Sequence, residues 1–318
     1  MPRGIPAFGF RNRRRTKAEM EAARAGMPIL PPELRENRTL VNRAEFDRRI
    51  VTVQHEAANI EPAETDEQIE AKLAARFEIL EMMTHAAIQG DVRALIVSGP
   101  PGLGKSYMVH ETLANSPCSN DHSVVKGYVK ATGLFKLLHR HRHAGQVLVF
   151  DDADEIFNDD TALTLLKTVC DSSKRRIVSY LSEAILIDEE TSERIPKTFE
   201  FEGTIVFITN LDFDAIIERG GRLAPHLSAL VSRAHYIDLA MKTKRDYLIR
   251  IRQVISQGLL NDIGLDEEGK NDVAEFIEEH KDRLRELSLR MALKVAHIRK
   301  GGSIHWRRFA VGTCCKNA

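Results

Sequence analysis

The sequence has few of the features that mark membrane, secreted or disulfide-stabilised proteins. No apolar run approaches the roughly 18 residues that a membrane-spanning helix needs, and the N-terminus lacks the apolar core of a secretory signal. The four cysteines, two of them adjacent (Cys314 and Cys315), make a poor disulfide framework and show no zinc-binding spacing. These absences predict a soluble protein with no membrane partner, located in the cytoplasm (the host cytoplasm if the source is a virus).

What is present favours a packed core with an uneven distribution of charge. Of the 318 residues, 43% are hydrophobic and 29% are charged, and the net charge is zero. Residues 1–50 carry 12 Lys and Arg against 6 Asp and Glu, whereas residues 288–318 carry 7 Lys and Arg and no acid. Such basic ends fit nucleic acid or another acidic surface as a partner. The alternative is a disordered Arg-rich arm and a solvated helix face.

The order of apolar segments predicts three regions. Residues 1–64 form a basic N-terminal arm or linker that is partly disordered, residues 65–240 an α/β core, and residues 241–318 a helical lid with a basic C-terminal tail. Strands that alternate with helices imply parallel pairing and a doubly wound sheet. We expect strands at 93–98, 123–130, 146–150, 203–209 and 235–239, with helices at 65–89, 104–115, 133–143, 160–173, 212–231, 243–258, 267–280 and 284–298.

The segment SGPPGLGKS contains the phosphate-binding pattern Gly99-x4-Gly104-Lys105-Ser106. Glycines allow backbone N–H groups to close around a phosphate, and the positive end of the following helix points at the same place. Lys105 can reach the β- and γ-phosphates, and the Ser106 hydroxyl can ligate Mg²⁺. The alternative is an ordinary Gly-rich turn. The predicted ATP-contacting residues are Gly99, Pro100, Pro101, Gly102, Leu103, Gly104, Lys105, Ser106 and Tyr107.

Two carboxylates follow the apolar run VLVF at the end of a predicted strand. A phosphate site needs one acid to hold Mg²⁺ and, for hydrolysis, a second acid to orient or deprotonate the attacking water. We therefore expect Asp151, with Ser106, at the metal and Asp152 at the water. Asp154 is interpreted as a turn former or as an N-cap of the next helix.

With these motifs and a helical domain behind them, the chain resembles the AAA+ ATPases, a branch of the P-loop NTPases, over about residues 65–300. The segment GTIVFITNLDFD is similar to the sensor-1 strand, with Asn210 as the residue that helps to place the water. APHLSALVSRAHYIDL is similar to the segment that carries the arginine finger, here Arg233, and ELSLRMALKVAHI to the sensor-2 helix, with Arg290 facing the γ-phosphate. Phage-type members and the branch with an insertion before sensor 1 are the candidate placements within the family.

The resemblance implies a P-loop NTPase fold with a doubly wound parallel five-stranded sheet and a small all-helical lid. It also implies ATP and Mg²⁺ as substrate and cofactor, and a homo-oligomeric ring, most often a hexamer. In that ring Arg233 would reach into a neighbouring subunit's site. Arg222 is the rival finger, and an internal salt bridge is the alternative for Arg233.

Residues 174–202 form an insertion before the sensor-1 strand, and AILID-EETSE-RIPKTF within it predicts a hairpin. Its position resembles that of a hairpin that projects toward the ring pore in some AAA+ branches; packing on its own subunit is the alternative. The loop after the second strand, VKATGLF, lacks the exposed aromatic–hydrophobic pair typical of protein-threading unfoldases, because we place Tyr128 on the strand.

The substrate class therefore stays open between DNA and protein. The basic ends, the run HRHRH (residues 139–143) and the weak pore loop favour an ATPase of DNA metabolism, such as a helicase loader, a clamp-loader-like protein or a replication factor. A protein remodeller is the alternative. Trp306 could stack on a base or anchor a terminal helix on the lid.

A slowly hydrolysing, nucleotide-gated binding protein is a third reading. Asp152 stands where AAA+ ATPases usually carry the longer Glu. Either the site has closed to compensate, or hydrolysis is slow and the protein acts partly as a nucleotide switch.

Overall fold

The structure is a computed structural model that describes residues 64–116, 122–183 and 185–316. The predicted arm therefore lies outside the described residues, except for its last residue. Among the described residues, no helix is long and apolar enough to cross a membrane.

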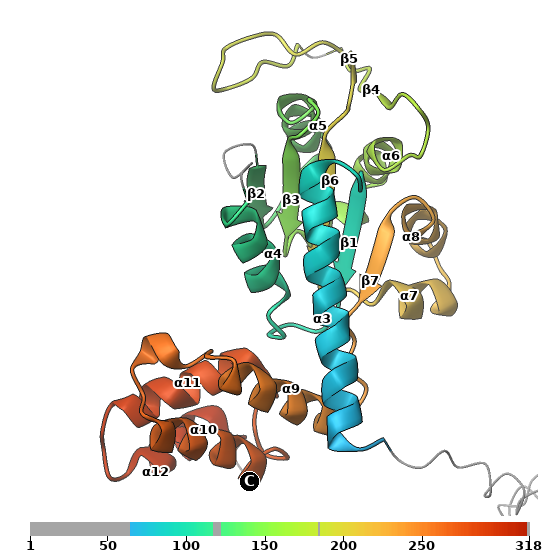
Figure 1. The fold of residues 1–318 in the computed structure, drawn as a ribbon. Helices are drawn as coiled ribbons and strands as arrows, with labels where there is room; N and C mark the ends of the chain where they lie inside the picture. Colours follow the sequence, from blue (N-terminus) through green and yellow to red (C-terminus); the bar gives the residue numbers. More distant parts are fainter. Residues whose placement is uncertain (1–63, 117–121, 184, 317–318) are drawn as a thin grey trace, which may run out of the picture. The chain divides into compact units, whose positions relative to one another are not determined.

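A parallel five-stranded sheet forms the centre of the α/β domain (Figure 1). Its strands are β2 (His122–Lys126), β3 (Val147–Asp151), β6 (Thr204–Thr209), β1 (Ala94–Ser98) and β7 (His235–Asp238), in that spatial order. Every neighbouring pair is parallel, so the strands all end at one edge of the sheet. This arrangement confirms the predicted fold class, a doubly wound α/β domain built on a parallel five-stranded sheet.

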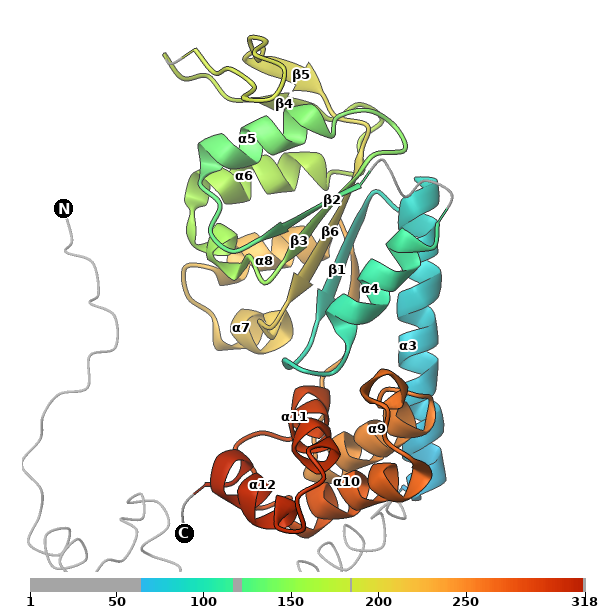
Figure 2. The ribbon, with the colours of Figure 1, turned by 90° about the vertical axis from the view of Figure 1, so that its left-hand side faces the viewer.

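Helices cover both faces of the sheet (Figure 2). One face packs against α3 (Asp66–Gln89) and α4 (Lys105–Ala114). The other packs against α5 (Ala131–Arg140), α6 (Asp160–Val169), α7 (Phe213–Arg219) and α8 (Ala224–Val231). Successive side chains of each central strand point alternately into the apolar clusters on the two faces of the sheet. Parallel strands that are buried on both faces require this pattern.

The C-terminal region is helical and has its own apolar core. It contains α9 (Lys244–Ser256), α10 (Glu267–Glu279), α11 (Leu289–Lys300) and α12 (Trp306–Cys314). Within the segment expected as a basic tail, α12 packs on the lid through residues spaced four apart: Trp306, Ala310 and Cys314.

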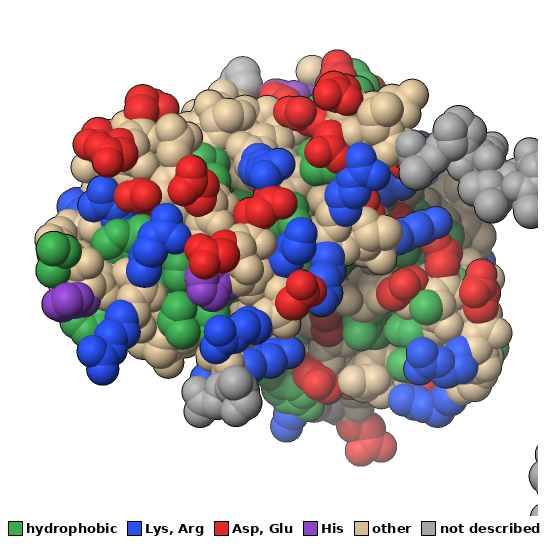
Figure 3. Space-filling model, turned by 90° about the horizontal axis from the view of Figure 1, so that it is seen from below, with side chains coloured by type: hydrophobic (Ala, Val, Ile, Leu, Met, Phe, Trp, Pro, Cys, Tyr) green, Lys and Arg blue, Asp and Glu red, His purple; other side chains and the backbone are tan. Residues whose placement is uncertain are grey.

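Some basic residues of this region pair with acids of the C-terminal helices. Arg299 pairs with Asp272, and Arg307 pairs with Asp272, Glu275 and Glu279. On the face drawn in Figure 3, Lys and Arg side chains are interspersed with Asp and Glu. Part of the excess of positive charge in residues 288–318 is balanced by ion pairs.

The insertion forms the predicted hairpin. Strands β4 (Ile177–Ser179) and β5 (Thr198–Glu200) pair antiparallel, and an isolated bridge joins Ile187 to Arg194. Its turn is held against α5, because Arg140 donates to Asp188 at 2.9 Å and pairs with Glu190. The Arg140 hydrogen bond, with backbone donors of the turn, lowers the pKa of Asp188 to about 2.

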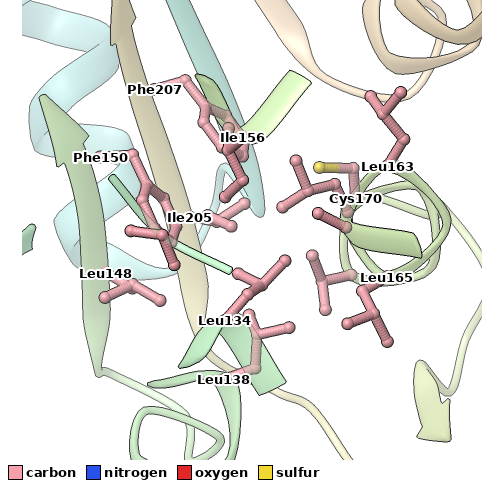
Figure 4. Close-up of a cluster of buried hydrophobic side chains, with 14 of the residues drawn as sticks. Leu134, Leu138, Leu148, Phe150, Ile156, Leu163, Leu165, Cys170, Ile205 and Phe207 are labelled. Atoms are coloured by element: carbon pink, nitrogen blue, oxygen red, sulfur yellow. The ribbon is translucent and has the colours of Figure 1, made fainter. Parts of the chain in front are cut away.

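The apolar core leads directly into the polar edge of the sheet. Phe150 of β3 and Phe207 of β6 stack with their ring centroids 5.4 Å apart, and Figure 4 shows both among buried side chains that come from these strands and from α5 and α6. Asp151 follows Phe150 immediately, and Asn210 follows the last residue of β6. The rigid core thus fixes where these polar residues emerge.

Candidate nucleotide site

The loop between β1 and α4 has the backbone of a phosphate cradle. Gly102 and Gly104 have φ values of +76° and +95°, a left-handed conformation that favours glycine. Gly104 is also the N-cap of α4, so the first N–H groups of this helix face the loop. A helix N-terminus of this kind attracts an anion.

Lys105 lies buried at the start of α4 and turns back over this loop. Its Nζ donates to the carbonyl of Pro100 at 2.8 Å and to Oδ1 of Asn210 at 3.0 Å. Burial lowers the pKa of Lys105 to about 8, although Asp152 and other nearby carboxylates raise it. A charged phosphate is a stronger acceptor than a carbonyl, so the ammonium group is placed to exchange these contacts for a nucleotide.

Asp151 is the most enclosed acid of the site, with a side chain that is 1% exposed. Ser106 Oγ donates to its Oδ1 at 2.7 Å, while Lys126 Nζ at 2.8 Å and His110 Nε2 at 3.0 Å contact its Oδ2. Burial raises the pKa of Asp151, but the hydrogen bonds from Lys126, Ser106 and His110 outweigh it, so the pKa lies below its usual value. The carboxylate is therefore ionised at neutral pH.

Asp152 adopts a backbone conformation that bears on why it is Asp rather than Glu. Its φ is +54°, in the left-handed region that Asp and Asn tolerate better than other non-glycine residues. Its Oδ1 accepts a hydrogen bond from Asn210 Nδ2 at 2.8 Å. The residue type thus suits the turn that brings this carboxylate to the edge of β6.

Asn210 joins the two halves of the site. Its amide accepts from Lys105 and donates to Asp152, and its backbone N–H donates to Asp154 Oδ2 at 3.3 Å. Of the two roles expected for Asp154, that of N-cap of α6 belongs to Asp159 instead, whereas Asp154 begins the 3-10 turn Asp154–Asn158. Asp154 holds the segment that carries Asn210.

The helical lid contacts the phosphate loop through the start of α11. The backbone N–H of Leu289 donates to the carbonyl of Gly102 at 2.8 Å, and a Cβ on Gly102 would lie 2.6 Å from Cβ of Ser288. Arg290, the next residue, is exposed and lies close enough for its charge to lower the pKa of Lys105. The structure thus brings the predicted sensor-2 residue near the loop.

The two candidate arginine fingers lie away from this group. Arg233 pairs with Asp171 at 3.3 Å and donates to the carbonyl of Ala229, whereas Arg222 pairs with Asp160 at 2.6 Å. Neither belongs to the hydrogen-bonded group around Lys105 among the described residues. The internal salt bridge that was the alternative for Arg233 is present.

Two tyrosines near the site are exposed. Tyr107 follows Ser106 on α4, and the charge of Glu111 raises its pKa. Tyr128 was expected on a strand, but β2 ends at Lys126 and Tyr128 is 70% exposed in the following loop. The reason is Gly127, whose φ of +87° ends the strand. An aromatic side chain is therefore exposed in the loop after β2, contrary to that expectation.

Other features that favoured nucleic acid have structural roles. Trp306 is buried and its ring centroid lies 5.7 Å from that of Phe276, so it anchors α12. Within the run HRHRH, Arg140 holds the hairpin turn, while His141 is buried and contacts Ser123 Oγ at 2.7 Å. Burial lowers the pKa of His141, so a positive charge on this residue is disfavoured.

His110 and Lys126 are the site residues that sequence reasoning missed. A signal for His110 exists, because it lies four positions after Ser106 and so shares its face of α4. Lys126 has no local signal; its partner Asp151 stands opposite it in the register of β2 and β3.

The side chains present fit Mg²⁺ as a cofactor. Ser106 and Asp151 offer a hydroxyl and an ionised carboxylate, the oxygen ligands that Mg²⁺ prefers. Among residues 64–316 as described, no group of three or more His, Cys, Asp or Glu side chains forms a metal site. The remaining ligands would then be water and phosphate oxygens, as is usual for this ion.

Comparison with known proteins places the chain beside a bacteriophage protein. No family model matches the sequence. An uncharacterized 36.7 kDa protein from the nrdC–mobD intergenic region of Enterobacteria phage T4 is 36% identical over 255 residues, which cover 79% of this chain and 77% of that protein. The chain belongs to the same family as this phage T4 protein.

More distant likenesses occur among solved structures. NtrX from Brucella abortus in complex with ADP matches with 12% identity and a TM-score of 0.42, over 88% of this chain and 60% of NtrX. RuvB from Thermotoga maritima matches with 16% identity and a TM-score of 0.39, over 77% of this chain and 68% of RuvB. This chain thus spans less than two thirds of NtrX.

Proposed function

We propose that this protein binds ATP with Mg²⁺ and hydrolyses it. The observation that carries the proposal is the chain of contacts from Lys105 through Asn210 to Asp152, beside the Ser106–Asp151 pair. It supplies a cation for phosphates, an oxygen set for Mg²⁺ and a carboxylate with an amide for the attacking water. Phosphoryl transfer needs positioning and charge stabilisation of this kind. When bound, Mg²⁺ would neutralise charge on the phosphates.

The proposal is tested by nucleotide binding and product analysis on the full chain. Wild-type protein is expected to bind a fluorescent ATP analogue and to convert ATP to ADP in the presence of Mg²⁺. Lys105→Ala should lose both, because the ammonium group reaches the phosphates. Lys281→Ala is the matched control, since this lysine lies on the lid and contacts Glu278. Equal activity in all three proteins would contradict the proposal.

The finer proposal is a ring, with a hexamer as the expected size, in which Arg233 acts on a neighbour's nucleotide. Its support is the position of Arg233 outside its own site and its partial exposure. An inactive Asp152→Asn subunit mixed with an inactive Arg233→Ala subunit should regain turnover, because some interfaces then contain both wild-type residues. No recovery at any mixing ratio, with mixed rings verified by mass, would contradict action in trans. The same experiment with Arg222→Ala tests the rival finger.

For the substrate, we propose a role in DNA metabolism, for which the remaining support is the basic character of residues 1–50. These residues lie outside the described part of the chain. DNA at low salt should stimulate ATP turnover, and the stimulation should fall as salt rises, because phosphate contacts release counterions. Turnover that ignores DNA but responds to a protein partner would contradict this role.

Protein remodelling is the second candidate, and one observation favours it. Tyr128 is exposed in the loop after β2, where protein-threading members of the AAA+ family carry an aromatic residue. Tyr128→Ala should then abolish stimulation by a protein substrate while leaving basal turnover unchanged. A slowly hydrolysing nucleotide switch would instead show tight ATP binding with turnover that neither partner stimulates.

A further inference from the structure

One helix holds both oxygens of the buried carboxylate Asp151. Ser106 and His110 lie on the same face of α4, and they contact Oδ1 at 2.7 Å and Oδ2 at 3.0 Å respectively. Because an ionised carboxylate only accepts hydrogen bonds, Nε2 of His110 carries the hydrogen in this contact. The two contacts together restrict rotation of the carboxylate and keep Oδ1 toward Ser106.

A cation from the neighbouring strand competes for the same group. Lys126 is the last residue of β2, and its Nζ lies 2.8 Å from Oδ2 of Asp151. The Lys126 side chain is 62% exposed, whereas that of Asp151 is almost fully buried. The ammonium group thus provides the partner that a buried carboxylate requires, but it also places a positive charge close to the expected Mg²⁺ position, where like charges repel.

We propose that His110 and Lys126 are positioning residues that set the affinity of the site for Mg²⁺ in opposite directions. His110 strengthens Mg²⁺ binding by orienting Asp151, and Lys126 weakens it by competing for the same carboxylate. The inference rests on the proposed function, because it concerns the same Mg²⁺·nucleotide site.

Replacing these two residues should change the affinity for Mg²⁺ in opposite directions. Loss of a partner that orients a metal-binding group typically weakens metal affinity 10- to 100-fold, so His110→Ala should weaken Mg²⁺ binding by about 10-fold. Because Lys126 is largely exposed, water screens its charge and its removal has a smaller effect, so Lys126→Met should tighten Mg²⁺ binding by roughly 2- to 5-fold. His110→Gln keeps an N–H near the position of Nε2 and should restore most of the affinity. Lys126→Arg keeps the charge and should resemble wild type.

The experiment is a Mg²⁺ titration of the full chain with a fluorescent ADP analogue already present. The signal is the Mg²⁺-dependent change in fluorescence of the bound nucleotide, which does not depend on turnover. The Mg²⁺ concentration for half-maximal ATP hydrolysis is measured in parallel at the same fixed pH. Nucleotide affinity in EDTA serves as the internal reference and should stay within about 2-fold of wild type, because both residues contact Asp151 and not the phosphate loop.

Opposite shifts for His110→Ala and Lys126→Met, with recovery in His110→Gln, support the inference. Shifts of the same sign, or an equal loss of affinity in EDTA, would overturn it, because either result indicates general damage to the site. If His110→Ala fails to fold, the variant at the exposed Lys126 still tests the inference. Unchanged or weaker Mg²⁺ binding in Lys126→Met contradicts competition between Lys126 and Mg²⁺ for Asp151. Absence of Mg²⁺-dependent nucleotide binding in wild type would refute the proposed function, whereas variants that match a binding-competent wild type refute this inference alone.

Discussion

Replacing Asp152 with Asn removes one negative charge and leaves the shape of the side chain almost unchanged. The Oδ1 atom of Asn can still accept the 2.8 Å hydrogen bond from Asn210, and Asn tolerates the left-handed backbone (φ +54°) as well as Asp does. The free energy of unfolding should therefore change by no more than about 0.5 kcal/mol. The carboxylate that would accept a proton from water is lost, which should reduce turnover by about 10²- to 10⁴-fold.

The assay combines three measurements on wild type and Asp152→Asn: chemical denaturation, affinity for a fluorescent ATP analogue, and single-turnover hydrolysis with excess protein. Stability and affinity should match, and only the hydrolysis rate should fall. Unchanged hydrolysis would remove Asp152 from the catalytic role. A parallel loss of stability would show that the side chain is structural.

The companion change, Asp152→Glu, tests why the shorter acid is present. A longer, non-Asx side chain in the left-handed region costs about 1 kcal/mol, and the extra methylene would carry the carboxylate past Nδ2 of Asn210. Turnover should then not rise, although Glu is the usual residue in AAA+ ATPases. A faster variant would refute this reasoning and would show that the short side chain restrains hydrolysis.

Three further predictions concern the lid, the lysine and the hairpin. Gly102→Ala should lower the free energy of unfolding, measured by denaturation, by roughly 1–3 kcal/mol more than Gly145→Ala does. Both glycines have a positive φ, but only a Cβ on Gly102 would clash with Ser288. Equal losses would contradict the contact between the lid and the loop. Lys105→Met should flatten the curve of unfolding free energy against pH between about pH 8 and 10.5. The pKa of Lys105 is lower in the folded state than in the unfolded state, so the unfolded chain binds more protons in this range. Wild-type stability therefore rises with pH there. An identical dependence of stability on pH in both proteins would show that Lys105 is exposed to solvent. Arg140→Ala should speed hydrogen exchange in residues 186–195, whereas Arg175→Ala, which removes an exposed pair with Glu200, should not; unchanged exchange would show that the Arg140 contacts do not hold the turn.

Much of the α/β core could be predicted, as could the proximity of several candidate site residues, because their signals are local. The pattern Gly99-x4-Gly104-Lys105-Ser106 and the acids after VLVF depend on spacing within one turn or one strand end. Parallel strands end at one edge, which explains why Asn210, over 50 residues after Asp152, still reaches it.

The features that the sequence did not predict depend on partners far apart in the sequence, or on the backbone angle of a single residue. Strand β2 ends at Lys126 because Gly127 has a positive φ. The valines on both sides of this glycine favour a longer strand, so the sequence pattern did not indicate the end. The charge of the last 31 residues seemed unbalanced because their acidic partners, such as Asp272, lie on α10. Lys126 could not be found, since only the strand register places it beside Asp151.

The central claim, that this site hydrolyses ATP with Mg²⁺, is tested most directly by phosphate release from the full chain under steady-state conditions. Wild-type protein should release phosphate from ATP only when Mg²⁺ is present, and both Lys105→Ala and Asp152→Asn should abolish the release while Lys281→Ala retains it. Phosphate release that survives Lys105→Ala, or no release from a wild-type protein saturated with Mg²⁺ and ATP, would contradict the account.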